Sequence, residues 1–450
     1  MELKEFDLIV IGTGSAATTA AYTCREKNLK VAIIDERPYG GTCANRGCDP
    51  KKILVGVASM VDESKRMTGY GIKEKSEISW EALMKFKSSF TDPVPESREK
   101  ALKEAGITCY HGTASFINED QVQVGEEILH FKKLLIATGA KPRPLSIHGE
   151  ELVIHSDDFL NLKTLPNEIV FIGGGFISFE FAHIAARAGA KVHILQRDDQ
   201  PLKNFDAELV GLLMKRSKEI GINIHLNTEP ESIEKLGEKY ILHMKEVSMI
   251  KELQCNLVVH GAGRIPNIES LNLEKGKISS SKKGIEVDEN LRSVSNVKVY
   301  AAGDVSSSEG LPLTPVAGME SEIVAYNLSI DEQKTGDYSV MPSIVFSIPS
   351  LASLGLTEEE AKKKGMEIKA NQFDTTQWYT YKRTREPVAK IKIVKDKNSQ
   401  KILGVHILGD NAAELINYFA LIMKFNLPLD EVKKVLFAYP TSASDLSHLL

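Results

Sequence analysis

Two pairs of short apolar runs set the pattern of the chain. Residues 6–11 and 30–34 are largely apolar and flank a glycine turn and a helical stretch, and residues 169–172 and 191–195 repeat this arrangement. Short apolar strands on either side of a helical stretch are typical of a buried parallel β-α-β unit. The pattern therefore predicts an α/β protein with two Rossmann-like dinucleotide-binding domains.

Further strands and helices are predicted between and after these units. Polar, helix-favouring residues from 81 to 105 predict one or two helices broken near Pro93 and Pro95. After about residue 338, alternating strands and helices predict a separate α+β domain. The strands expected outside the two units span 108–110, 121–124, 134–136, 343–346, 389–394 and 402–408, and the late helices span 357–364, 412–425 and 428–435.

The first glycine turn has the residues of a dinucleotide fingerprint. Gly12 allows a tight turn, and Gly14 lets the backbone approach a pyrophosphate at the amino end of a helix. Asp35 ends the second strand about 20 residues later, where it can accept hydrogen bonds from ribose hydroxyls. This unit is predicted to bind the ADP half of a dinucleotide.

The second fingerprint differs at its acidic position. Gly173 and Gly175 open the helix, but the residue after the next strand, 191–195, is Gln196 and not a carboxylate. A neutral side chain removes repulsion from a 2′-phosphate, and Arg197 and Lys203 can pair with one. The alternative is a solvated basic surface, because two aspartates lie between the cations. We expect NADPH at this second site, with NADH as the alternative.

Residues 40–52, GGTCANRGCDPKK, carry the chemistry. On a regular helix, cysteines five apart would be separated by a rise of roughly 7.5 Å, beyond the reach of a disulfide. A bridge between Cys43 and Cys48 needs distorted backbone, which Gly47 permits. Pro50 suits the first turn of a helix, and the helix dipole there favours a thiolate at Cys48. The pair is interpreted as a redox-active dithiol.

Other uses of these cysteines fit less well. A zinc site needs a second pair of ligands at suitable spacing, and Cys24, Cys109 and Cys255 are isolated. A structural disulfide that closes so short a loop adds little to a chain of 450 residues. We expect no metal site and three buried apolar thiols.

Composition and charge narrow the function classes. Hydrophobic residues make up 42% of the chain, and the net charge is −5, which gives no electrostatic reason to expect nucleic acid or an anionic membrane. No apolar run approaches the roughly 18 residues of a membrane helix, and the start does not form a signal peptide. Paired cysteines that are catalytic and not structural suit a reducing cytoplasm.

The dithiol run resembles the active-site motif of the flavin-dependent pyridine nucleotide-disulfide oxidoreductases, the group of dihydrolipoamide dehydrogenase, glutathione reductase and mercuric reductase. Their pattern is Gly-Gly-x-Cys-x4-Cys-x-Pro-Ser/Thr-Lys, and only Lys51 departs from it. The resemblance extends over the whole chain. It implies a homodimer with a shared active site, in which an FAD-binding domain (1–148) is followed by an NAD(P)H-binding domain (149–268), the second part of the FAD-binding domain (269–337) and a dimerisation domain (338–450).

The resemblance also implies roles for individual residues. Cys48 would face the flavin and Cys43 the acceptor, with Lys52 and Glu180 as a buried ion pair beside the flavin. The residues implied in FAD binding are Gly12, Gly14, Ser15, Asp35, Thr42, Cys43, Lys52, Ala114, Thr138, Gly139, Asp304, Thr314 and Ala317. Those implied in nicotinamide cofactor binding are Gly173, Gly175, Phe176, Ile177, Glu180, Arg197, Lys203 and Gly263.

The carboxyl-terminal run departs from the family. Where relatives carry a catalytic histidine and its glutamate, this chain has Tyr439 and Ser444. A tyrosine with a pKa near 10 is a poor proton shuttle at neutral pH, and His448 is expected to be a surface residue. The arginine pair of glutathione reductases and the carboxyl-terminal cysteine pair of mercuric reductases have no counterpart at Ala20, Ala21 and residues 447–450.

These observations predict an FAD-dependent oxidoreductase that passes electrons from NADPH through Cys43 and Cys48 to a small-molecule acceptor. A low-molecular-weight disulfide, a persulfide or a soft metal ion suits the missing histidine, because such acceptors need less proton assistance. Two alternatives stay open. One is an NAD(P)H:quinone oxidoreductase whose flavin reduces the acceptor directly, and the other is a redox-sensing flavoprotein with little turnover.

Overall fold

The computed structural model describes residues 4–247, 249–329 and 333–450 and divides into two compact units. Unit 1 comprises Met1–Pro50, Phe86–Arg143 and Arg264–Tyr338, and unit 2 comprises Lys51–Lys85, Pro144–Gly263 and Ser339–Leu450. The chain passes between the units within α3 (Cys48–Met67) and again within α4 (Trp80–Thr91). The predicted nicotinamide and dimerisation domains thus fall in one unit.

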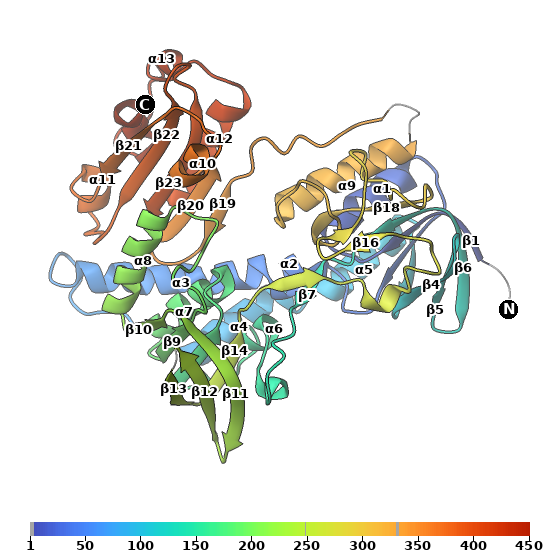
Figure 1. Ribbon diagram of the computed structural model, residues 1–450, viewed down its shortest axis with the longest axis horizontal. Helices are drawn as coiled ribbons and strands as arrows, with labels where there is room; N and C mark the ends of the chain where they lie inside the picture. The colour runs from blue at the N-terminus through green and yellow to red at the C-terminus, as the bar shows by residue number, and fades with distance from the viewer. Residues whose placement is uncertain (1–3, 248, 330–332) are drawn as a thin grey trace. The chain divides into compact units, whose positions relative to one another are not determined.

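Unit 1 is built on a seven-stranded sheet with the order β3-β2-β1-β6-β5-β4, in which β18 pairs with β6 (Figure 1). The strands β3, β2, β1, β6 and β18 run parallel, so their carboxyl ends meet at one edge of the sheet. The bounds are β1 Lys4–Ile11, β2 Val31–Asp35, β3 Thr108–His111, β4 Ala114–Asn118, β5 Gln121–Val124, β6 Glu127–Ile136 and β18 Val299–Ala301.

Two helices of unit 1 pack together over this sheet. They are α1 (Ser15–Glu26) and α9 (Thr314–Ser329), and the Ala20 backbone N–H donates to Ser321 Oγ across their contact at 2.9 Å. Four small buried residues, Ala16, Ala17, Ala20 and Ala21, give α1 the smooth face that this close packing needs. The other elements of the unit are α2 Gly41–Arg46, α5 Val94–Glu104, β7 Ala140–Pro142, β15 Arg264–Pro266, β16 Ser280–Ser281 and β17 Gly284–Ile285.

Unit 2 contains a second parallel sheet, with the order β10-β9-β8-β14. Its helix α7 (Phe176–Arg187) is buried along most of its length, which explains why its sequence is apolar on nearly every side. A three-stranded antiparallel sheet, β11-β12-β13, follows. The bounds are β8 Glu168–Ile172, β9 Lys191–Leu195, β10 Ile222–His225, β11 Thr228–Leu236, β12 Lys239–Glu246, β13 Met249–Cys255, β14 Leu257–His260, α6 Ser156–Phe159 and α8 Ala207–Glu219.

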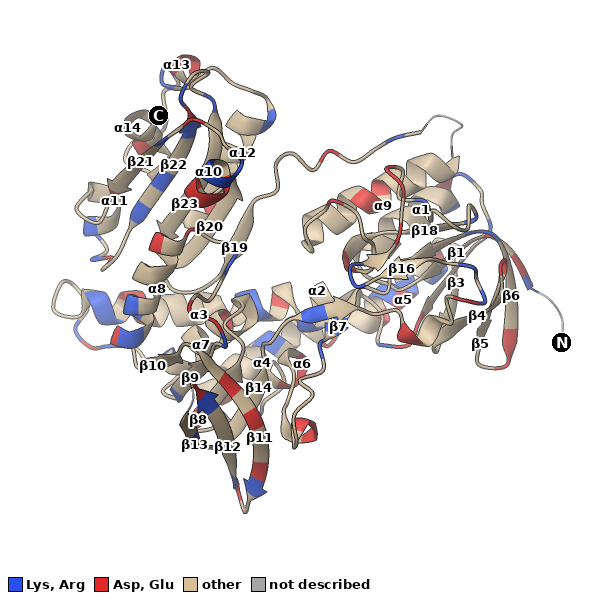
Figure 2. Cartoon of the chain, in the orientation of Figure 1, with Lys and Arg blue, Asp and Glu red and all other residues tan. Residues whose placement is uncertain are grey.

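The carboxyl-terminal part of unit 2 is a five-stranded antiparallel sheet with the order β19-β20-β23-β22-β21. Lysines lie along β22 (Figure 2), and one of them, Lys392, is buried and pairs with Asp206 and Glu358 at 3.0 Å each. The bounds are β19 Ser343–Val345, β20 Ser350–Gly355, β21 Ile368–Asp374, β22 Lys390–Asp396, β23 Ile402–Gly409, α10 Glu358–Lys363, α11 Tyr379–Lys382, α12 Ala412–Lys424, α13 Leu429–Val432 and α14 Leu446–Leu449.

Most predicted elements are confirmed to within a few residues, including the break between α4 and α5 before Pro93. The expected α/β class with two parallel dinucleotide-type sheets is also confirmed. Among the described residues, no helix is long and apolar enough to span a membrane.

Candidate active site

The two cysteines meet where one helix ends and the next begins. Helix α2 ends at Arg46, α3 begins at Cys48, and Gly47 forms the break. A Cβ on Gly47 would lie 2.9 Å from the Thr42 carbonyl oxygen and 3.2 Å from Cys43 Cα. Only a residue without a side chain lets the backbone fold back this closely. The predicted distortion at Gly47 is confirmed, and Pro50 stands in the first turn of α3 as expected.

The thiols contact each other and the start of α9. Cys48 Sγ lies 3.6 Å from Thr314 Oγ1, at the first residue of that helix. Hydrogen bonding to Cys48 and burial raise the pKa of the Cys43 thiol, and Thr314 opposes this shift. Asp49 adds to it, with a carboxylate oxygen 3.9 Å from Cys43 Sγ. The reduced pair therefore holds a proton at Cys43 at neutral pH.

The first glycine turn of unit 1 forms a cradle that fits the pyrophosphate of FAD. Gly12 has φ +112°, and a Cβ there would lie 2.3 Å from the Ala137 carbonyl oxygen. Gly41, at φ +70°, approaches so closely that its Cβ would lie 2.4 Å from Gly14 Cα. No side chain caps α1 at Gly14, so the N–H groups next to Ser15 are open to an anion.

Asp35 lies at the end of β2, where the fingerprint predicts it. Its Oδ2 accepts from Thr13 Oγ1 at 2.6 Å and its Oδ1 from the Arg37 backbone N–H at 2.9 Å. The carboxylate is thus tied to the glycine turn and oriented before any ribose hydroxyl binds. Thr13 also accepts from the Gly40 N–H at 3.1 Å, which links this turn to the dithiol segment.

The remaining predicted flavin residues of unit 1 occupy the ends of its strands and the start of α9. Asp304 follows β18, and burial raises the pKa of its carboxyl group while Arg264 opposes this. Thr138 donates to the Asn267 carbonyl oxygen at 2.7 Å and thereby joins the two chain segments that leave the unit. Ala114 begins β4, Gly139 has φ +67° beside β7, Thr42 lies in α2, and Ala317 is buried in α9.

Glu320 is a site residue that sequence reasoning missed. Its buried carboxylate accepts from the Gly303 N–H at 2.6 Å, from Ser308 Oγ at 2.5 Å and from the Tyr338 hydroxyl at 2.9 Å. These bonds hold the turn that presents Asp304. Helix α9 carries two glutamates, Glu320 and Glu322, among mostly apolar and small residues, and a glutamate in such a helix could have served as the signal.

The expected ion pair between Lys52 and Glu180 is replaced by one that uses the preceding lysine. Lys51 Nζ lies 2.9 Å from Glu180 Oε1, and the Phe346 N–H donates to the same oxygen at 2.9 Å. Lys52 instead lies over the Phe346 ring, with its Nζ 3.9 Å from the centroid. Burial raises the pKa of Glu180, and Lys51 opposes the shift. The lysine at the family's Ser/Thr position explains this exchange, because it supplies a second cation one residue earlier.

The second glycine turn, in unit 2, repeats the geometry of the first. Gly173 has φ +99°, and its Cβ would lie 2.5 Å from the Gly261 carbonyl oxygen. Gly175 precedes α7, which no side chain caps. Phe176 begins that helix half exposed, Ile177 follows it, and Gly263 has φ +102° after β14. This open helix start fits a second pyrophosphate.

The Gln196 side chain holds the second glycine turn in place. Its side-chain oxygen accepts from the Gly174 N–H at 2.9 Å, and the side chain is buried. Arg197 and Lys203 follow it on the surface, with 66% and 58% of their side chains exposed, and both pair with Asp198. The two predicted cations are thus brought together, although a carboxylate lies between them.

The carboxyl-terminal motif is exposed in unit 2. Tyr439 is 82% exposed, and Ser444 exchanges hydrogen bonds with Thr441. His448 is exposed, as expected, and lies within α14, where its ring meets Trp378 edge-on at 6.0 Å between centroids. His406 is buried between Ser353 and the Leu356 carbonyl oxygen.

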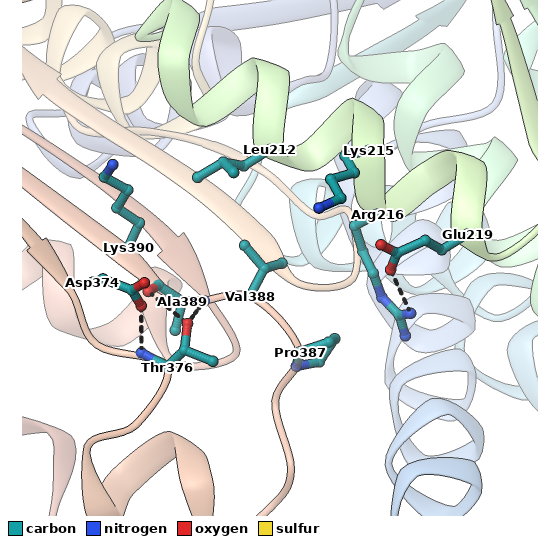
Figure 3. Close-up of a pocket in the computed structure, with 10 residues that line it drawn as sticks. All are labelled: Leu212, Lys215, Arg216, Glu219, Asp374, Thr376, Pro387, Val388, Ala389 and Lys390. Atoms are coloured by element: carbon teal, nitrogen blue, oxygen red, sulfur yellow. Dashed lines mark hydrogen bonds and ion pairs between the residues drawn. The ribbon is translucent and has the colours of Figure 1, made fainter.

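A cavity of about 230 Å³ lies in unit 2 beside α8, β21 and β22 (Figure 3). Several of its charged groups are already paired, since Arg216 pairs with Asp62 and Glu219, and Lys390 with Glu208. No predicted site residue lines it. Within the described part of the chain, no group of three or more His, Cys, Asp or Glu residues is arranged to hold a metal ion.

Comparison with known proteins agrees with this geometry. Residues 6–321 match the family model "Pyridine nucleotide-disulphide oxidoreductase", and residues 341–449 match its dimerisation domain. The chain is 31% identical to a mercuric reductase of Lysinibacillus sphaericus over 98% of this chain and 81% of that protein. It is also 31% identical to a glutathione reductase of Burkholderia cepacia over 99% and 98% of the two chains.

A solved structure shares the fold over nearly the whole length. The Cu(II) complex of the HOCl-induced flavoprotein disulfide reductase RclA from Escherichia coli matches with a TM-score of 0.89 and 27% identity, over 99% of each chain.

Proposed function

We propose that this chain, which belongs to the pyridine nucleotide-disulphide oxidoreductase family, passes electrons from NADPH through Cys43 and Cys48 to a soft metal ion or a small disulfide or persulfide. The family consists of flavin enzymes that use FAD and NAD(P)H, and the chain carries its dimerisation domain. The observation that carries the proposal is the dithiol at the Gly47 break, held against the start of α9.

Bound FAD would accept a hydride from the nicotinamide cofactor and supply an electron pair to the disulfide. The residues of unit 1 fit it, with Gly12, Gly14 and Asp35 at the ADP half and Asp304 and Thr314 at the flavin half. The start of α9 would place its positive end near the flavin, which favours negative charge there. In unit 2, Lys51 and Glu180 would form the buried ion pair, while Phe176 would cover the nicotinamide position.

The protein's own contribution to the last step is the dithiol. Two-electron reduction of the disulfide, with uptake of one proton, gives a thiolate at Cys48 and a thiol at Cys43, and Cys43 must lose its proton to attack. With a disulfide acceptor, the mixed disulfide formed at Cys43 is displaced by Cys48, so that NADPH, one proton and RSSR give NADP⁺ and two RSH. Reduction of a metal ion forms no leaving group that must be protonated, since NADPH and Hg(II) give NADP⁺, Hg(0) and one proton. This suits the tyrosine at position 439.

A soft metal ion is the favoured acceptor. Two relatives support it, because one is a mercuric reductase and the other was solved as a Cu(II) complex. Two sulfurs at the surface of a helix break are suitable ligands for such an ion. Cys48 is exposed and Cys43 half-buried.

We propose a homodimer whose second copy covers α12. Two apolar side chains of this helix, Tyr418 and Leu421, and the residue that caps its end, Phe425, are 39%, 55% and 67% exposed. The segment belongs to the dimerisation domain match, and large exposed apolar patches mark interaction sites. The family's shared active site would then place Tyr439 of one copy near the dithiol of the other. Leu421→Lys is expected to shift the sedimentation coefficient from dimer to monomer, and an unchanged dimer would contradict this interface.

The experiment that tests the function compares acceptors on the FAD-loaded protein and on a variant with Cys43→Ser and Cys48→Ser. NADPH oxidation with Hg(II), Cu(II) and an aromatic disulfide is expected to fall more than about a hundredfold in the variant, while a quinone, reduced by flavin directly, serves as the control. Efficient quinone reduction that survives the change, with slow metal and disulfide reduction in the unmodified protein, would favour a quinone oxidoreductase. Slow turnover with every acceptor would favour a redox sensor.

A further inference from the structure

Three side chains at the proposed NADPH site direct hydrogen-bond donors at one oxygen atom. Lys203 Nζ lies 2.7 Å, Gln196 Nε2 3.2 Å and Arg197 Nε 3.4 Å from Asp198 Oδ2. The donors come from the end of β9 and from the loop before α8. Two cations and an amide that converge on one acceptor oxygen make an arrangement suited to an anion.

Hydrogen bonds hold the Gln196 side chain and the Asp198 backbone in place, while the charged side chains of the cluster are open to solvent. Gln196 cannot swing away easily, since its oxygen is bonded to the Gly174 N–H and its nitrogen also donates to the Gln200 carbonyl oxygen at 3.2 Å. The Asp198 carbonyl oxygen accepts from the Asn227 N–H at 3.1 Å, which anchors the backbone. By contrast, the Asp198 side chain is 34% exposed and both cations are more so, so a ligand can reach them.

Asp198 is therefore a charged occupant of the place where a phosphate would bind. The ion pair with Lys203, followed by Arg197, holds the pKa of Asp198 below its usual range, so the carboxylate is ionised at neutral pH. A 2′-phosphate would have to displace it from both cations and would be repelled by it. The unphosphorylated ribose of NADH meets neither obstacle.

We propose that Asp198 is a specificity-determining residue that competes internally with the 2′-phosphate of NADPH and so narrows the preference for NADPH over NADH. The inference rests on the proposed function, since it takes Arg197 and Lys203 as the phosphate site. The role of Asp198 goes beyond the proposed function, because it states how a carboxylate between two cations affects the choice between NADPH and NADH.

The test uses Asp198→Asn in the full-length FAD-loaded protein. The amide keeps the shape and one acceptor oxygen but removes the charge. Asp199→Asn is the matched control. This substitution changes the net charge by the same amount, and the Asp199 side chain forms no hydrogen bond or ion pair within the described chain. The probes are 2′,5′-ADP and 5′-ADP, whose binding is measured by titration calorimetry at low salt.

Asp198→Asn is expected to tighten 2′,5′-ADP binding by about three- to tenfold, because exposed ion pairs are each worth up to about a factor of five. Binding of 5′-ADP should change less than about twofold, and Asp199→Asn should leave both probes within about twofold. An equal gain in 2′,5′-ADP affinity from the two substitutions would mean that only the net charge of the surface matters, and it would overturn the proposal. An unchanged or weaker affinity in Asp198→Asn would overturn it too, since the carboxylate would then orient the cations and not compete.

A further variant separates this inference from the NADPH assignment. Arg197→Ala with Lys203→Ala should lose the advantage of 2′,5′-ADP over 5′-ADP. If it does not, the phosphate site lies elsewhere and the NADPH proposal fails, whatever Asp198 does. Because nucleotide binding is measured without an acceptor, neither result depends on the dithiol chemistry.

Discussion

The two dinucleotide turns of this protein share their geometry and differ in the charge at the strand end. Gly12 and Gly173 have similar φ values, +112° and +99°, and each turn opens a helix that no side chain caps. In unit 1 the next strand, β2, ends at Asp35, and in unit 2 the next strand, β9, is followed directly by Gln196. Both side chains bond back to their own turn, Asp35 by accepting from Thr13 and Gln196 by accepting from the Gly174 N–H.

This comparison separates two tasks that one residue performs. An oxygen acceptor at the strand end holds the turn, and an amide does this as well as a carboxylate. The charge of that residue then decides whether a ribose hydroxyl or a phosphate is favoured beside it. The helices differ in one further respect, because α7 carries the fully buried Glu180 where the corresponding position of α1 carries Thr19.

The largest expected effect comes from adding a side chain to the first glycine of each dinucleotide turn. In Gly12→Val, a side chain would meet the Ala137 carbonyl oxygen, and we expect a colourless protein without bound FAD. In Gly173→Val, the clash with Gly261 should leave the protein yellow but abolish NADPH oxidation. Absorbance at the flavin bands and NADPH binding distinguish them, and loss of flavin in both variants would show that the two sites cannot be assigned separately.

Removing Lys51 should cost about 3–5 kcal/mol of unfolding free energy, the range for breaking a buried ion pair by removing one partner. Lys51→Met leaves Glu180 buried without its cation, whereas Lys52→Met keeps the pair. Urea unfolding of the two variants measures the difference. A larger loss of unfolding free energy in Lys52→Met would indicate that Lys52 pairs with Glu180, as the family motif implies.

Gln196→Glu tests the charge at the strand end. We expect kcat/KM for NADPH to fall by about ten- to a hundredfold, in line with about 1.5–3 kcal/mol for a bond to a charged group, while the value for NADH changes little. Steady-state kinetics with ferricyanide as acceptor measures this without involving the thiols. A parallel loss with both cofactors would mean that the substitution has only disturbed the turn.

The last expected effect is one of pH. Because the pKa of Cys43 is raised above its usual value, the thiolate is the minor form at neutral pH, and its fraction rises up to about tenfold for each pH unit below that pKa. Reduction of a disulfide should therefore accelerate from pH 6 to 9, while ferricyanide reduction, which bypasses Cys43, should not follow this slope. Stopped-flow measurement of each half-reaction would show it, and a pH-independent thiol step would contradict the raised pKa.

The sequence predicts those parts of the fold that depend on local chemistry. Gly47 could be identified as the break because two cysteines five apart cannot otherwise meet. The strands β11 and β13 escaped detection because their glutamates and lysines resemble a polar loop or helix, and β20 because Ser350–Gly355 has no β-branched residue.

Within the site, the residues that were missed act through tertiary contacts. Which of two adjacent lysines reaches Glu180 depends on how α3 packs beside Phe346, and no spacing rule fixes that. Glu320 contacts Gly303, Ser308 and Tyr338, which only the folded chain brings together. The two aspartates between Arg197 and Lys203 in the sequence already suggested that a carboxylate could pair with these cations. Only the structure shows that Asp198, and not Asp199, makes the contacts.

The central claim is that electrons from NADPH reach the Cys43/Cys48 pair, and a thiol count tests it most directly. The chain has five cysteines, so air-oxidised, FAD-loaded protein should show three reactive thiols after denaturation, and anaerobic treatment with NADPH should raise the count to five. Cys48→Ser, with Cys43 left unpaired, should show four under both conditions. A count in the unmodified protein that NADPH does not change would contradict the account, because the pair would then take no part in electron transfer.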